Sequence, residues 1–171
     1  MDQTIPSLPR ISYPKYDHLE LKPSFITGFG GLSAAIECHR HGHDVEIYES
    51  FAELKALGDI ITFGSNAGRV FVRWSNGAVA QEMRSLSIDT SKHGFNIHKY
   101  DTGEVVINQK TPPYNAEAPY FNGHRGELHE IVYNYARDVL KIPINLNRRI
   151  ENYFENDKEA GIILASGEKV G

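Results

Sequence analysis

Three glycines that stand between an apolar segment and a helical pattern constrain this chain most: Gly28, Gly30 and Gly31. The apolar segment covers residues 24–27, and after the glycines apolar residues recur with the 3.6-residue period of a helix. Residues 44–49 alternate in polarity and include β-branched and aromatic side chains, which predicts a strand. The order of strand, glycine turn, helix and strand predicts a βαβ unit whose two strands run parallel.

A βαβ unit with a glycine turn can bind the diphosphate of a dinucleotide. Residues without side chains let the backbone come close to the diphosphate, and the helix N–H groups point toward the anion. Glu49 ends the second strand, where a carboxylate accepts hydrogen bonds from the adenosine ribose hydroxyls. The alternatives are that the glycines serve only tight packing of the helix on the strand, and that Glu49 is a solvated strand end.

The rest of the chain is expected to add further helices and strands, so the predicted fold class is α/β. Helices are expected at residues 51–57, at 65–74 with Ser65 or Asn66 as the cap, and at 126–140. An antiparallel hairpin is expected from strands 95–100 and 104–109, and further strands at 144–154 and 161–164. Prolines among polar residues predict an extended arm over residues 1–23.

Charge and composition argue against several classes of protein. The formal net charge is -4 and no basic run is present, so nucleic-acid binding is not expected. No apolar stretch is long enough to span a membrane, and no secretory signal is expected. Cys38 is the only cysteine, which excludes an internal disulfide and suits the reducing cytoplasm. His39, His41 and His43 do not share one helix face, so no metal site is expected.

Several short motifs follow one another along the chain. They are GGLSAAI at 30–36, GHDVEIYE at 42–49, GDII at 58–61 with GSNA at 64–67, HRGELH at 124–129, and GIIL at 161–164. Their order, from about Phe25 to Gly171, resembles that of the class A FAD-dependent monooxygenases of the salicylate hydroxylase-like group. The resemblance implies a Rossmann-like FAD-binding unit over residues 24–171, in which a hairpin insert at about 93–122 begins the substrate domain.

The resemblance also implies roles for individual residues. The three glycines would line the FAD pyrophosphate, and Glu49 would bind the ribose. Arg125 would contact FAD near the flavin or the ribityl chain, because its fixed charge and planar donor fork suit cofactor oxygens; the alternative is a surface arginine. Arg40 is expected near the adenine. No catalytic residue is expected in this segment.

In a complete relative, the resemblance implies that NAD(P)H reduces FAD and that the reduced flavin reacts with O2. One oxygen atom then enters an aromatic or related small molecule. The cofactor carries this chemistry, whereas the protein supplies binding, orientation and exclusion of water.

The glycine turn departs from the Gly-x-Gly-x-x-Gly pattern of the family. Aligned without a gap, Gly28 and Gly31 match the second and third glycines, and Ile26 takes the place of the first. A side chain at Ile26 is expected to crowd the path of the chain into the helix. The alternative register, Gly28-x-Gly30-x-x-Ser33, leaves a very short first strand. Both registers predict weak or absent FAD binding by the chain alone.

The chain ends at Gly171, before the later Asp-Gly and Gly-Asp motifs of the family. The resemblance therefore implies a truncated family member that is inactive on its own. Three hypotheses stay open: the FAD-binding segment of a monooxygenase, a truncated non-catalytic flavoprotein relative, and an NAD(P)-binding module without flavin.

Overall fold

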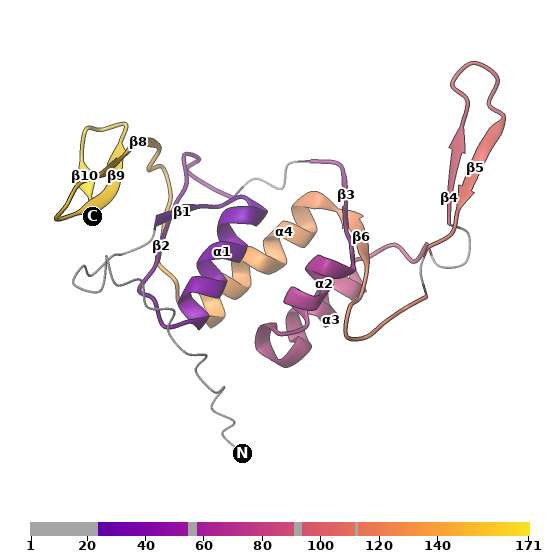
Figure 1. The fold of residues 1–171 in the computed structure, drawn as a ribbon, viewed down its shortest axis with the longest axis horizontal. Coiled ribbons are helices and arrows are strands. Elements are labelled where there is room, and N and C mark those ends of the chain that lie inside the picture. Colours follow the sequence, from indigo (N-terminus) through magenta and orange to yellow (C-terminus); the bar gives the residue numbers. More distant parts are fainter. Residues whose placement is uncertain (1–23, 55–57, 91–93, 112) are drawn as a thin grey trace. The chain divides into compact units, whose positions relative to one another are not determined.

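The computed structural model describes residues 24–54, 58–90, 94–111 and 113–171 (Figure 1). The chain forms two compact units. The first combines the chain up to Lys55 with Val132–Gly171, and the second is Ala56–Ile131. Each unit contains helices and strands, so the α/β fold class is confirmed. The arm predicted for residues 1–23 lies outside the described residues.

The first unit contains a parallel sheet with the strand order β1-β2-β7. Its strands are β1 Ser24–Ile26, β2 Glu46–Tyr48 and β7 Ile144–Asn145. Ile26 lies opposite Tyr48, so β1 and β2 run parallel and end at the same edge. Helix α1, Phe29–Arg40, connects them and packs against both (Figure 1). The βαβ unit predicted from the glycine pattern is therefore confirmed.

The core face of α1 follows from helical spacing. Leu32, Ala35 and Ile36 lie at positions i, i+3 and i+4 and are completely buried. After the helix, Gly42 has a φ of 85°, a left-handed conformation that glycine adopts without steric strain. Gly42 thus lets the chain turn between the end of α1 and strand β2.

A second sheet completes the first unit. It has the antiparallel order β8-β9-β10, with β8 Ile150–Glu155, β9 Ala160–Leu164 and β10 Lys169–Val170. Tyr48 of β2 packs against Ile162 and Leu164 of β9, so the two sheets share a small apolar core. The single strand predicted for 144–154 is divided into β7 and β8, because Asn147 takes a left-handed φ of 56° between them.

Among the described residues, the second unit contains α2, η1, α3 and the first part of α4, together with the antiparallel strand pairs β3-β6 and β4-β5. Its elements are β3 Ile60–Phe63, α2 Ser65–Phe71, η1 Trp74–Gly77, α3 Ala78–Ser85, β4 Phe95–His98, β5 Val105–Gln109 and β6 Phe121–His124. Helix α4, Arg125–Asn134, begins directly after β6 and continues as the π-helical turn η2, Tyr135–Val139. The predicted hairpin and the helix predicted for 126–140 are both present.

Aromatic side chains form the core of the second unit. The ring of Phe71 lies 5.1 Å from that of Trp74, 5.2 Å from Phe63 and 5.9 Å from Phe121, measured between centroids. Trp74 is completely buried, as is Met83 of α3. Gly68 of α2 brings its backbone against that of Pro119, because a Cβ there would lie 1.9 Å from the Pro119 carbonyl oxygen.

Some predicted elements differ from the structure. Residues 51–54 are not helical, because the carbonyl of Phe51 accepts a hydrogen bond from Asn147 N at 2.9 Å and holds this segment beside the β7–β8 turn. The N-cap of α2 is Gly64 rather than Ser65 or Asn66. Within the described ranges, no helix combines the length and the apolar character that crossing a membrane requires.

Candidate functional site

The amino end of α1 lies directly after β1, at the edge where β1 and β2 both end. Gly28 is the N-cap residue, and its carbonyl accepts the first helical hydrogen bond from Leu32 N at 2.9 Å. Among the described side chains, none caps this helix, and its first turn contains no acidic residue. The positive end of the helix dipole is therefore not neutralised by the helix itself.

The three glycines have different surroundings. A Cβ at Gly31 would lie 1.9 Å from the carbonyl oxygen of Ile26, so the backbones of helix and strand are in contact there. A Cβ at Gly28 or at Gly30 would meet no atom within 4 Å. Gly31 thus serves close packing, whereas Gly28 and Gly30 leave open space that fits a diphosphate. This division agrees with the register in which Gly28 and Gly31 are the second and third glycines.

The expectation that Ile26 crowds the turn is wrong. Its side chain is 56% exposed, and the group that approaches Gly31 is its main-chain carbonyl. The side chain therefore points away from the contact between strand and helix. Crowding by Ile26 is therefore no reason to expect weak FAD binding, and weak binding by the chain alone stays a prediction.

Glu49 follows β2 and lies at the same edge as the amino end of α1. Its Oε2 accepts a hydrogen bond from the Thr27 hydroxyl, and its Oε1 accepts bonds from Ser50 Oγ at 2.8 Å and Phe51 N at 3.0 Å. Its backbone N–H donates to Asn145 O at 2.9 Å. The carboxylate is thus held beside the glycine turn, where it can accept bonds from ribose hydroxyls.

A second carboxylate on β2 has a different role. Glu46 accepts a hydrogen bond from the Tyr48 hydroxyl at 2.5 Å and one from Asn145 Nδ2 at 3.3 Å. Burial and the bond to Glu46 hold the pKa of Tyr48 well above its ordinary value, so this phenol stays protonated as a donor. Glu46 is therefore engaged within the sheet.

Arg40 lies at the carboxyl end of α1, whereas the glycine turn lies at its amino end. Twelve residues at about 1.5 Å each separate these ends by roughly 17 Å. Arg40 Nη1 pairs with Glu37 Oε1 on the same helix at 3.2 Å. The structure therefore separates Arg40 from the glycine turn, and its expected place near the adenine stays a prediction.

Arg125 is the first residue of α4 and lies in the second unit. Its backbone N–H donates to Asp59 O at 2.8 Å. Its side chain covers Gly58, where a Cβ would lie 2.8 Å from Arg125 Cδ. Gly58 also has a φ of 125°, so glycine is required there by conformation and by space. The GDII and HRGELH motifs thus meet through this contact.

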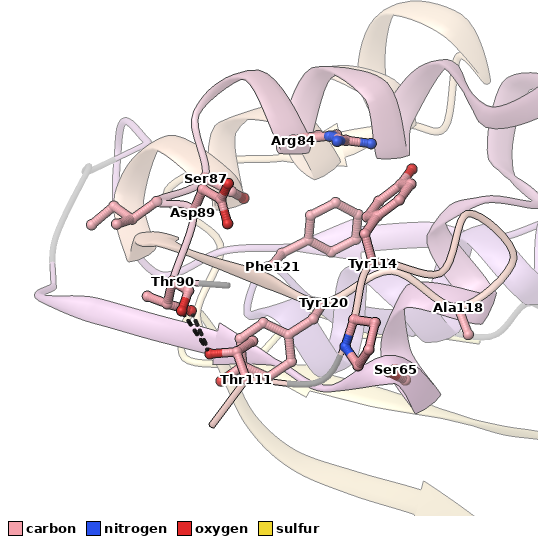
Figure 2. A pocket seen from close by; sticks show the side chains of 12 residues that line it. Ser65, Arg84, Ser87, Asp89, Thr90, Thr111, Tyr114, Ala118, Tyr120 and Phe121 are labelled. Atoms are coloured by element: carbon pink, nitrogen blue, oxygen red, sulfur yellow. Dashed lines mark hydrogen bonds between the residues drawn. The ribbon is translucent and has the colours of Figure 1, made fainter. Parts of the chain in front are cut away.

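A pocket of about 190 Å³ lies in the second unit (Figure 2). Its wall combines aromatic rings, hydroxyls and two charged groups, from Ser65, Arg84, Ser87, Ile88, Asp89, Thr90, Thr111, Pro113, Tyr114, Ala118, Tyr120 and Phe121. The guanidinium of Arg84 lies over the Tyr114 ring, 3.8 Å from its centroid. Thr90 and Thr111 join two walls through a 2.9 Å hydroxyl contact. Such a wall suits a small planar molecule with polar substituents.

The sequence analysis did not identify this pocket. Its lining comes from α2, the end of α3, residues 87–90 after that helix, the segment that leads into β6 and the first residue of β6, and no motif joins these stretches. Tyr114 and Tyr120 in a proline-containing loop are a signal that could have pointed to it, because binding residues lie disproportionately on loops.

No protein-family model matches the chain, but comparison with known proteins gives monooxygenase relatives. Asperlicin C monooxygenase of Petromyces alliaceus is 38% identical over 146 residues, which cover 84% of this chain and 30% of the relative. The FAD-dependent monooxygenase okaB of Penicillium ochrochloron is 38% identical over 141 residues, which cover 80% and 30%. The chain thus spans about 30% of the length of these curated relatives.

Solved structures with a similar fold include an FAD-bound protein. CtdE, in a complex with FAD and a substrate, matches with a TM-score of 0.75 and 30% identity, over 88% of this chain and 35% of CtdE. FqzB matches with a TM-score of 0.71 and 30% identity over the same shares. The resemblance to FAD-dependent monooxygenases that the sequence motifs predicted is confirmed.

Proposed function

We infer that this relative of the FAD-dependent monooxygenases is an FAD-binding segment of such an enzyme, and that its first unit binds the ADP part of FAD. One observation carries the proposal. The open amide end of α1 at Gly28 and Gly30 lies at the same sheet edge as the held carboxylate of Glu49. A diphosphate and a ribose are neighbours in ADP, and these two groups are their complements.

When bound, FAD would supply redox chemistry with NAD(P)H and O2 that no side chain of this chain can supply. The chain's own residues would bind and orient. The amides of the first α1 turn would meet the diphosphate, and Glu49 would accept hydrogen bonds from the ribose. Gly31 would keep the helix close to β1, so that its amino end stays beside Glu49. We retain Arg125 as a proposed contact of the flavin or ribityl part, based on the resemblance of its motif.

Replacing Glu49 with glutamine is expected to weaken ADP binding about 10- to 100-fold, because charge-assisted hydrogen bonds to the ribose become neutral ones. Isothermal titration of the full chain with ADP measures this. The replacement Glu53→Gln, at an exposed residue outside the site, is the control and should leave the affinity unchanged. Equal ADP affinity of Glu49→Gln and the unmodified chain would contradict the role of Glu49.

The same titrations separate the two flavoprotein hypotheses from the NAD(P)-binding module without flavin. Because both FAD and NAD contain ADP, binding of ADP alone does not distinguish them. The dissociation constants for FAD, NAD and NADP are therefore compared directly. We expect FAD to bind most tightly and its flavin fluorescence to change on binding. Tighter binding of NAD or NADP than of FAD would instead favour the nicotinamide-binding module. FAD binding without oxidation of NAD(P)H is expected both from the truncated FAD-binding segment and from the non-catalytic relative, so it separates these two hypotheses only from the nicotinamide-binding module.

We also propose that about residues 93–122 begin a substrate domain and that the pocket in the second unit takes part in binding a small aromatic substrate. The support is the pocket wall, where Tyr114, Tyr120 and Phe121 all come from that segment. The single cysteine suits work in the cytoplasm.

Single-ring aromatic compounds, with phenol as the first probe, are expected to bind this pocket at millimolar concentration. In two-dimensional NMR spectra, the amide signals that shift should include those of Thr90 and Thr111 on its wall. Amides of β8–β10, which form a separate sheet, serve as the internal control and should not shift. Shifts confined to that sheet would contradict the assignment.

A further inference from the structure

Thr27 occupies the single position between β1 and the N-cap of α1. It is 4% exposed, and its hydroxyl donates to Oε2 of Glu49. Because Ile26 and Tyr48 are partners in the parallel register, the residues that follow them, Thr27 and Glu49, become neighbours at the sheet edge. A branched side chain such as threonine has few rotamers, so its hydroxyl is held in place.

The other contacts of the Glu49 carboxylate are local in sequence. Ser50 Oγ and Phe51 N both bind Oε1, and both lie within two residues of Glu49. Thr27 is different, because it reaches the carboxylate from the turn that also carries Gly28. The bond therefore ties the position of the carboxylate to that of the amino end of α1. A carboxylate accepts about four hydrogen bonds, so acceptor capacity remains for a ribose hydroxyl.

We propose that Thr27 is a positioning residue, which holds the Glu49 carboxylate in the conformation that meets the adenosine ribose while the α1 amides meet the diphosphate. This inference rests on the proposed function. Without the Thr27 hydroxyl, Oε2 of Glu49 loses its hydrogen bond to the turn between β1 and α1, and the Glu49 side chain is expected to sample other rotamers. Binding of ADP must then order Glu49, and this ordering lowers affinity.

The test compares Thr27→Val, which keeps the branched shape and removes the hydroxyl, with Thr27→Ser, which keeps the hydroxyl. By titration with ADP, Thr27→Val is expected to bind about fivefold to tenfold more weakly, and Thr27→Ser within about twofold of the unmodified chain. In a chain that already carries Glu49→Ala, which has no acceptor for the Thr27 hydroxyl, Thr27→Val should have little further effect on ADP affinity, because the two residues act through one bond.

A ligand-free measurement tests the holding role directly. Scalar couplings in the NMR spectra report the side-chain rotamers of Glu49, and we expect one rotamer in the unmodified chain, averaging in Thr27→Val, and one rotamer again in Thr27→Ser. A purely structural role of Thr27 would change the thermal melt without changing these couplings.

The outcomes separate the two proposals. If the unmodified chain binds ADP while Thr27→Val binds it equally or more tightly, the positioning role is overturned and the proposed function stands. If the unmodified chain binds neither ADP nor FAD, the proposed function is overturned, and the ribose role of Thr27 falls with it even where the couplings show a single rotamer.

Discussion

Replacing Gly31 with alanine is expected to lower the free energy of unfolding by about 3 kcal/mol or more, or to prevent folding. The added methyl group would lie 1.9 Å from the carbonyl oxygen of Ile26. Both contact partners belong to backbone, in helix α1 and strand β1, so no side-chain rotation can relieve the overlap. Helix and strand would have to separate, and Leu32 and Ile36 would lose their buried contacts.

Gly30 offers a matched control one residue away. Its Cβ would face open space, and alanine is favoured over glycine inside a helix by up to about 1 kcal/mol, so Gly30→Ala should fold normally or be slightly more stable. The same methyl group would stand where the diphosphate is proposed to approach, so ADP binding should weaken. Chemical denaturation followed by circular dichroism measures stability in both variants. Equal stability of Gly31→Ala and Gly30→Ala would contradict the close contact of α1 with β1.

Replacing Trp74 with alanine is expected to cost about 3–5 kcal/mol of stability, because a large aromatic side chain leaves a cavity that the surroundings fill only in part. Trp74 is completely buried and contacts Phe71, which in turn contacts Phe63 and Phe121. The loss should therefore spread through α2 and the β3-β6 pair. Urea unfolding monitored by circular dichroism measures it.

Tyr100 serves as the control for Trp74, because it is an aromatic residue of the same unit whose side chain is fully exposed. Tyr100→Ala should change stability by less than about 0.5 kcal/mol. Amide hydrogen exchange in the Trp74→Ala chain should rise in α2 and α3, where the aromatic core is lost. Unchanged exchange there would mean that the cluster contributes little to the second unit.

The sequence predicted those elements whose pattern is local. Leu32, Ala35 and Ile36 repeat with the helix period, and the fold buries all three. The pair β3-β6 was missed because its partners lie far apart in the chain, as the 3.0 Å bond from Thr62 Oγ1 to Asn122 Oδ1 illustrates. Strand β6 also contains asparagine and glycine, which are rare in strands.

In the candidate site too, the sequence predicts the residues that belong to a local motif and misses those whose contacts depend on strand pairing. The sequence identifies Glu49 and the glycines because they belong to a motif. It does not show that Gly31 contacts the main chain of Ile26 while Gly28 and Gly30 face open space, because that difference depends on the fold. The expectation that the Ile26 side chain crowds the turn is wrong, because a sequence does not say which way a strand-end residue points. Thr27 lies between two motif positions, and its bond to Glu49 depends on the register of β1 with β2.

The backbone of Glu49 bonds to the end of β7 and to the turn that follows it: its N–H donates to Asn145 O at 2.9 Å, and its carbonyl accepts from Arg148 N at 2.7 Å. A segment almost one hundred positions further along the chain therefore shares control of this carboxylate. Substitutions in the two segments should therefore be correlated among related proteins. An insertion at Asn147 that the fold tolerates should still shift the position of the Glu49 backbone. Chimeras that exchange either segment with a relative should succeed most often when both are exchanged together.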